Sequence, residues 1–73
     1  MDENQDNNLG QKIRKLRKEL GLSQDELARK ADIPYTTLTK IEIGVIKNPS
    51  FKAVSKIAEA LDVNLDDLTN LAI

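Results

Sequence analysis

Residues 23–44, SQDELARKADIPYTTLTKIEIG, decide the fold of this 73-residue chain. Ser23 and Glu26 form a capping box, in which the hydroxyl and the carboxylate each satisfy a backbone N–H at a helix start. Pro34 removes a backbone donor and disfavours the helical conformation at Ile33, so this helix must end before the proline. The stretch therefore predicts two short helices joined by a tight connection.

The second helix of this stretch is predicted to run over about residues 35–43. Pro34 suits the start of a helix, and Gly44 suits the position just after its end. Leu38 and Ile41 are expected to face inward. The outward-facing positions are Tyr35, Thr36, Thr39, Lys40 and Ile43. Most of this outer face is therefore polar and uncharged.

Apolar residues at helical spacing predict three further helices. The first runs over about residues 9–20, with Ile13, Leu16 and Leu20 on one stripe. Ser50 is predicted to cap a fourth helix and Asn64 a fifth. Their inward-facing residues are expected to be Phe51, Val54, Ile57, Ala58 and Leu61 in the fourth, and Leu65, Leu68 and Leu71 in the fifth. With no strand or repeat, the predicted fold class is all-α, a compact five-helix bundle.

The length allows one domain, residues 9–73, after a polar acidic segment at 1–8 that we expect to be a disordered tail. A chain of this size buries only about 60% of its unfolded surface, so its stability is marginal. Without cysteine or histidine it has no disulfide or structural zinc site. The missing stability must come from well-formed helices or from a partner subunit, so a homodimer is expected as the first candidate assembly.

The residue inventory argues against an enzyme. The chain has no histidine or cysteine, and its three glycines are scattered at positions 10, 21 and 44 rather than gathered in a phosphate loop. Asp66 and Asp67 are neighbours on a predicted helix and point apart, so they cannot share a proton. We expect no catalytic residue, metal or cofactor. The N-terminus lacks the features of a signal peptide and no stretch approaches the ~18 apolar residues of a membrane span, so we expect a cytoplasmic protein.

The net charge of -1 hides a segregated distribution. Residues 9–56 hold all eleven bases against five acids, a local net charge of +6 (11 − 5), whereas the two ends are acidic. A basic centre can bind phosphate although the whole chain is acidic. On the helix at 9–20, bases on an amphipathic helix usually form a solvated face, so at most one or two of them should approach a nucleic acid. They are Lys12, Arg14, Lys15 and Lys18.

The predicted helix pair resembles a helix-turn-helix, with Gln24, Ala28, Ile33, Leu38 and Ile41 at its characteristic positions. The flanking segments IRKLRKELGLSQDELARKA, LTKIEIG, NPS and KIAEALDVNLDDL extend the match over about residues 9–71. This set resembles the Xre family, the phage-repressor and Cro type of DNA-binding domain. The resemblance implies a lambda-repressor-like fold and a sequence-specific transcriptional regulator that binds double-stranded DNA.

The resemblance also implies roles for individual residues. Tyr35, Thr36, Thr39 and Lys40 would reach base edges in the major groove, which presents a distinct pattern for each base pair. Gln24, Thr37, Lys47 and Asn48 would contact backbone phosphates. Arg17 and Glu42 would form a buried ion pair between the first and third helices. Simpler interpretations remain for Tyr35 as an aromatic that covers Pro34, for Gln24 as a good first-turn residue, and for Arg17 as an exposed base.

Three positions depart from the family pattern. Asp32 stands where glycine is usual, and it tolerates the left-handed backbone that the turn requires. Pro34 replaces the usual capping Ser or Thr. Val45 and Ile46 replace a basic pair, which removes phosphate contacts.

The resemblance further implies a twofold dimer contact at Phe51, Val63, Asn64 and Leu65, whereas core packing would account equally for Phe51 and Leu65. The acidic edge at Asp25, Glu26 and Asp32 would contact RNA polymerase in some relatives, or would serve only in capping and solubility. We expect a complete chain without a sensor domain, and therefore control by its own concentration. A third interpretation is an inert fragment of a larger regulator, and the starting Met1 and the completed fifth helix argue against it. The alternative function is a protein-interaction module, such as an antitoxin or a bridging transcription factor on the same fold, favoured by Val45, Ile46 and the acidic ends.

Overall fold

The computed structural model describes residues 8–69, and these residues form five helices and no strand. The helices are α2 (Asn8–Glu19), α3 (Gln24–Ala31), α4 (Tyr35–Glu42), α5 (Phe51–Leu61) and α6 (Leu65–Thr69). The all-α five-helix prediction is therefore confirmed for this part of the chain. Asn8, which was assigned to the tail, is instead the first residue of α2. The rest of the predicted tail, and Leu71, lie outside the described residues.

The capping box predicted at the start of α3 is present. Ser23 Oγ accepts a hydrogen bond from the Glu26 backbone N–H at 3.0 Å, and Glu26 Oε1 accepts one from the Ser23 N–H at 2.8 Å. Ser50 likewise caps α5 by accepting from the Ala53 N–H at 3.1 Å. Such caps satisfy backbone donors that a helix start leaves free.

Asp32 ends α3 in the left-handed conformation, with φ 61°. The Asp32 N–H donates to the Arg29 carbonyl and the Ile33 N–H to the Ala28 carbonyl, which is a Schellman motif with aspartate in the place of glycine. Residues 58–63 repeat this arrangement at the end of α5, where Asp62 has φ 62°. The first left-handed turn was expected from the sequence and the second was not.

The core is aliphatic and draws on all five helices. Its buried residues are Ile13, Leu27, Ala28, Ala31, Leu38, Ile41, Val54, Ile57, Ala58, Ala60, Leu61 and Leu68. Two residues predicted to face inward do not. Leu20 is 50% exposed because α2 ends at Glu19, and Phe51 is 73% exposed at the first position of α5. Helical periodicity does not hold at positions where the helix has ended or has just begun.

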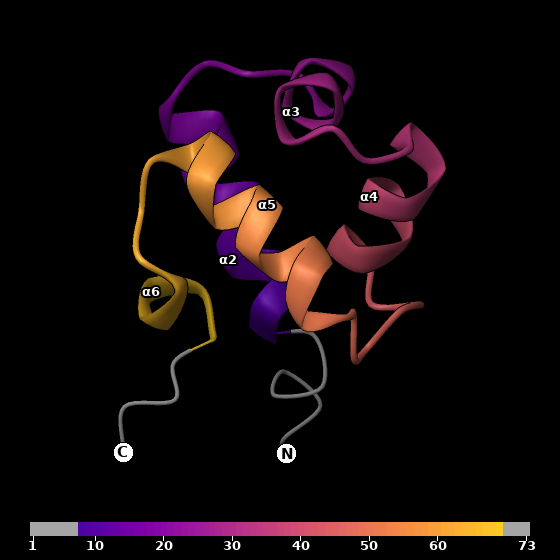
Figure 1. Cartoon of the computed structure of the whole chain (residues 1–73). Coiled ribbons are helices and arrows are strands. Elements are labelled where there is room, and N and C mark those ends of the chain that lie inside the picture. Colours follow the sequence, from indigo (N-terminus) through magenta and orange to yellow (C-terminus); the bar gives the residue numbers. More distant parts are fainter. Residues whose placement is uncertain (1–7, 70–73) are drawn as a thin grey trace.

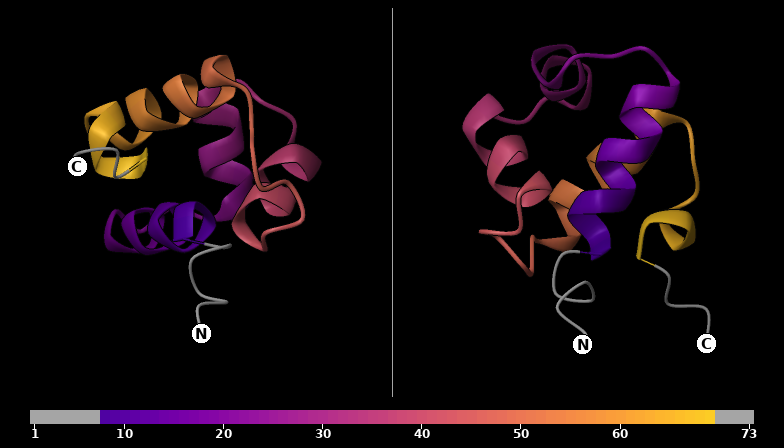
Figure 2. Two further views of the ribbon diagram at one scale, coloured as in Figure 1. Left: turned by 90° about the horizontal axis from the view of Figure 1, so that it is seen from below. Right: turned by 180° about the vertical axis from the view of Figure 1, so that it is seen from behind.

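The arrangement leaves α4 on one flank of the bundle and α6 on the opposite flank in all three ribbon views (Figure 1, Figure 2). Helix α5 crosses the middle of the molecule and packs against α3, α6 and α2. Helix α4 packs against α2 and α3. Its outer side is consequently left facing away from the rest of the chain.

Candidate nucleic-acid interface

A buried ion pair fixes α4 against α2. Arg17 Nε donates to Glu42 Oε2 at 2.8 Å and Nη2 donates to Glu42 Oε1 at 3.1 Å, while Nη1 donates to the Leu22 carbonyl at 2.9 Å. The Arg17 side chain is 10% exposed and the Glu42 side chain 1% exposed. The predicted pair is present, and the simpler interpretation of Arg17 as an exposed base is wrong.

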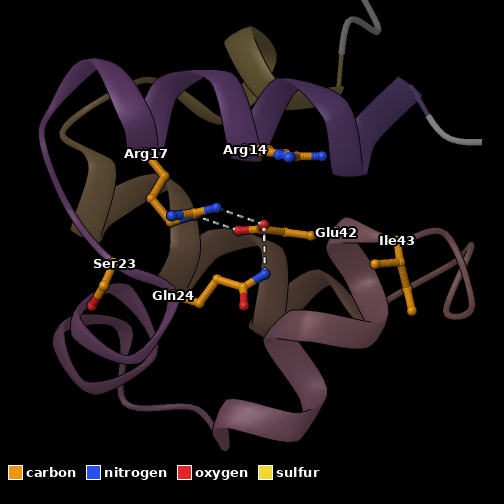
Figure 3. Close-up of a pocket in the computed structure, with 6 residues that line it drawn as sticks. All are labelled: Arg14, Arg17, Ser23, Gln24, Glu42 and Ile43. Atoms are coloured by element: carbon orange, nitrogen blue, oxygen red, sulfur yellow. Dashed lines mark hydrogen bonds and ion pairs between the residues drawn. The ribbon is translucent and has the colours of Figure 1, made fainter.

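Gln24 joins this ion pair from the first turn of α3. Its Nε2 donates to Glu42 Oε1 at 3.0 Å (Figure 3). The carboxylate of Glu42, on α4, therefore accepts hydrogen bonds from a side chain of α2 and a side chain of α3. This contact spans 18 positions of sequence and was not predicted. Since an amide nitrogen has two N–H groups, one Gln24 donor remains for another acceptor.

The outer face of α4 presents the four residues that were predicted to read bases. Tyr35 is 49% exposed, and Thr36 and Lys40 are also exposed. Thr39 is half-buried, and its hydroxyl donates to the Thr36 carbonyl at 2.9 Å. Its hydroxyl proton is therefore committed to the backbone, which leaves the oxygen as an acceptor and the methyl group as an apolar contact.

The loop after α4 is tied back to that helix. The Ile46 N–H donates to the Lys40 carbonyl at 3.0 Å. Lys47 and Asn48 are exposed on this loop, while Thr37, on the helix itself, is half-buried. Val45 is 64% exposed, so an apolar side chain faces solvent where the family pattern places a base. Ile46 instead packs against the core.

An open cleft of about 420 Å³ lies between α2, the start of α3 and the end of α4. It is lined by Arg14, Arg17, Ser23, Gln24, Glu42 and Ile43. Its charged residues are two arginines and one glutamate, so its lining has a net charge of +1 (2 − 1). The cleft adjoins the same α4 whose outer face is exposed.

A model of the helix-turn-helix family matches residues 13–68, which include all of α3, α4 and α5. The chain belongs to this helix-turn-helix family. The Xre-type resemblance is thereby confirmed.

Curated relatives of this helix-turn-helix chain are transcriptional regulators. It is 40% identical over 62 residues to the regulator SinR of Bacillus licheniformis, which covers 85% of this chain and 56% of SinR. It is also 40% identical over 60 residues to SinR of Bacillus subtilis (strain 168), and this match covers 82% of this chain and 54% of that SinR. An uncharacterized helix-turn-helix regulator of Archaeoglobus fulgidus is 35% identical over 57 residues, covering 78% of this chain and 80% of that protein. The chain spans about half the length of the SinR proteins.

Solved structures of SinR share the fold of this helix-turn-helix chain. The N-terminal DNA-binding domain of SinR from Bacillus subtilis superposes with a TM-score of 0.82 at 39% identity, covering 85% of this chain and 90% of that one. A crystal structure of SinR in complex with DNA gives a TM-score of 0.80 at 40% identity, covering 82% and 95%. A structure of a SinR–SinI complex superposes with a TM-score of 0.83 at 38% identity, and the match covers 86% of this chain and 61% of that chain.

The four residues predicted to form a dimer contact differ in their surroundings. Phe51 is exposed at the start of α5, and Asn64 is exposed after its end. Val63 and Leu65 are half-buried and pack against the core. Helix α5 has 11 residues and is about 16 Å long, so Phe51 lies at the opposite end of this helix from Asn64.

The acidic edge of α3 is largely engaged within the chain. Asp25 Oδ2 lies 2.7 Å from Arg29 Nη2 in an exposed pair, and Glu26 serves the capping box. Asp32 Oδ2 lies 3.9 Å from Lys56 Nζ. Local pairing and capping therefore engage Asp25 and Glu26, whereas the Asp32 carboxylate stays largely in solvent.

Residues 8–69 contain no group of three or more acidic, histidine or cysteine side chains placed to hold a metal ion. None of the helices in this range has the length and apolar character needed to cross a bilayer.

Proposed function

We propose that this chain is a sequence-specific DNA-binding transcriptional regulator that inserts α4 into the major groove of double-stranded DNA. The observation that carries the proposal is the exposed outer face of α4. The C-terminal end of this helix is fixed to α2 by the Arg17–Glu42 pair. The major groove admits an α-helix. The similarity of the fold to the SinR–DNA complex, at 40% identity, supports the same use of the helix here.

Base reading is assigned to Tyr35, Thr36, Thr39 and Lys40. The Lys40 amine can donate to guanine O6 or N7, and the threonine methyl groups can contact a thymine methyl. Thr39 takes part through its oxygen and its methyl group, because its proton is held by the Thr36 carbonyl. These side chains read bases less strongly than arginine or glutamine, so the specificity of each half-site is modest.

Backbone contacts are assigned to Gln24, Thr37, Lys47 and Asn48. The amide of Gln24 bridges Glu42 and a phosphate, with one N–H on each. Lys47 and Asn48 are exposed on the loop that follows α4. Contacts to phosphate position a protein on the duplex without reading its sequence.

The regulator acts as a homodimer on a pseudo-palindromic operator, with half-sites about 34 Å apart. Phe51 supports this assembly because it is 73% exposed, and burial of its ring at a subunit contact would remove apolar surface from water. Asn64 is the other exposed member of the proposed contact, and Val63 and Leu65 supply its partly buried floor. The complex forms in the cytoplasm, and the acidic edge of α3 is the surface that would meet RNA polymerase.

The second candidate function is a protein-interaction module on the same fold. Ile43 and Val45 are 65% and 64% exposed, and Phe51 is more exposed still. An antitoxin or bridging factor would use these apolar side chains to hold a protein partner.

Selection of bound sequences from random duplexes tests the proposal. We expect a pseudo-palindromic consensus. Replacing Lys40 with alanine should relax the preference at one position, whereas Gln24→Ala should weaken binding to all sequences alike. Because Gln24 also bonds Glu42, the melting temperature of that variant must be measured with its affinity. Selection that returns no consensus, with DNA binding that is absent at low salt, would favour the interaction module.

A further inference from the structure

Helix α2 carries four bases outside the ion pair. Three of them line one of two grooves beside the helix, and Lys18 lines neither. Arg14 lines the cleft beside α4. Lys12 and Lys15 line a second groove of about 340 Å³ between α2 and α6. Helices α4 and α6 lie on opposite flanks of the bundle (Figure 1, Figure 2), so one groove is bordered by α4 and the other by α6.

The guanidinium of Arg14 is the cation that the cleft leaves available. Arg17 uses Nε, Nη1 and Nη2 on Glu42 and on the Leu22 carbonyl. Arg14 is exposed, and no residue within 8–69 accepts a hydrogen bond from it or pairs with its charge. Figure 3 shows the Arg14 side chain at the edge of α2 that borders the cleft, running along the helix and away from Arg17.

The charges around the cleft favour an anion at Arg14. The Glu42 carboxylate already accepts hydrogen bonds from Arg17 and from Gln24, so its negative charge is compensated within the protein. The remaining charge in the cleft is the +1 of Arg14. A guanidinium presents parallel N–H groups that match two oxygens of a phosphate.

We infer that Arg14 binds a backbone phosphate of the duplex that α4 enters, and that Lys12 and Lys15 do not contact this duplex. The inference rests on the proposed function and deepens it, because it extends the phosphate contacts from α3, α4 and the following loop to α2. The phosphate occupies the cleft between Arg14 and the remaining N–H of Gln24. The duplex is thereby contacted by Arg14 of α2 as well as by the exposed Lys47 of the loop after α4.

The salt dependence of DNA affinity tests the inference with Arg14→Ala and a charge-matched control, Lys15→Ala. The probe is a 30-base-pair duplex of mixed sequence, titrated by fluorescence anisotropy between 50 and 200 mM salt. Each phosphate neutralised contributes about -0.9 to the slope of log K against log salt. The Arg14→Ala slope should be shallower by about 0.9, so its affinity deficit should be about 3.5-fold larger at 50 mM than at 200 mM. The Lys15→Ala slope should match that of the wild type.

A third variant separates charge from geometry. Arg14→Lys keeps the charge and should restore the slope, although it loses the paired donors and should bind more weakly than the wild type at every salt concentration. Equal slopes for Arg14→Ala and Lys15→Ala would overturn the inference while leaving DNA binding intact. A wild-type chain with no salt-dependent affinity would overturn both this inference and the proposed function. Thermal melts of all three variants should match the wild type, because both positions are exposed.

Discussion

Removal of the Glu42 carboxylate should destabilise the fold far more than removal of any exposed charge. Glu42→Ala leaves Arg17 and Gln24 without their shared acceptor, with the Arg17 side chain only 10% exposed. Breaking a buried pair in this way costs about 3–5 kcal/mol. A chain of 73 residues has roughly 4–11 kcal/mol of total stability at the usual per-residue value. The substitution should therefore remove at least about a quarter of this stability, and all of it at the lower end of the range.

Urea denaturation followed by far-UV circular dichroism measures this loss. The matched control is Arg29→Ala, which removes an ion pair with side chains 78% and 56% exposed. We expect that control to lose less than about 1 kcal/mol, since water screens an exposed pair. The double substitution R17M with E42L should recover much of the stability, because replacing both charges by apolar side chains removes the cost of burying them.

A small loss of unfolding free energy in Glu42→Ala would refute this reasoning. If Glu42→Ala costs no more than Arg29→Ala, then the carboxylate is solvated in solution and does not fix α4. A double-mutant cycle over Arg17 and Glu42 gives the same test, and a coupling energy below about 0.5 kcal/mol would contradict a pair in direct contact.

Three further substitutions test other parts of the structure. Ser23→Ala should cost about 1 kcal/mol in urea denaturation, because the Glu26 N–H loses its side-chain acceptor; an unchanged midpoint would contradict the capping geometry. Leu38→Ala should cost about 2–5 kcal/mol, since Leu38 is fully buried, and a loss below 1 kcal/mol would mean that α4 is not packed as described. Phe51→Ser should leave the thermal melt of the dilute protein unchanged but weaken self-association by about tenfold or more in sedimentation equilibrium, whereas unaltered association would exclude this residue from the dimer contact.

Features encoded by nearby residues could be predicted from the sequence. The capping box needs only Ser23 and Glu26, three positions apart, and both of its hydrogen bonds are present. The left-handed residue at Asp32 followed from the resemblance, because the family pattern usually has glycine at that position of the turn. The equivalent Asp62 was missed, although the local pattern is the same: an aspartate between an apolar residue and a β-branched one, in ADI and LDV.

Features that depend on helix ends and on distant contacts could not be predicted in the same way. The stripe through Ile13 and Leu16 assumed that α2 continued to Leu20, but the helix ends one residue earlier and the leucine faces water. Phe51 matches the inward spacing of α5, yet it lies at the helix start and is exposed.

In the candidate site, too, some contacts could be predicted and others could not. The resemblance implied the Arg17–Glu42 pair correctly, whereas no local pattern reports that Gln24 lies beside Glu42. Among the four bases on α2, Arg14 stands three positions before Arg17 and so shares its helix face. The groove that each base lines depends on the packing of α4 and α6, which the sequence does not show. The roles of the residues toward DNA stay predictions.

Chemical-shift mapping of the ¹⁵N-labelled chain with a duplex selected from random DNA tests most directly whether the outer face of α4 meets the bases. We predict that the largest amide shifts fall within residues 35–40, with a second group at Gln24, and that α6 is unaffected. Shifts confined to α5 and α6, or no shifts at a saturating concentration of the selected duplex, would contradict a major-groove role for α4.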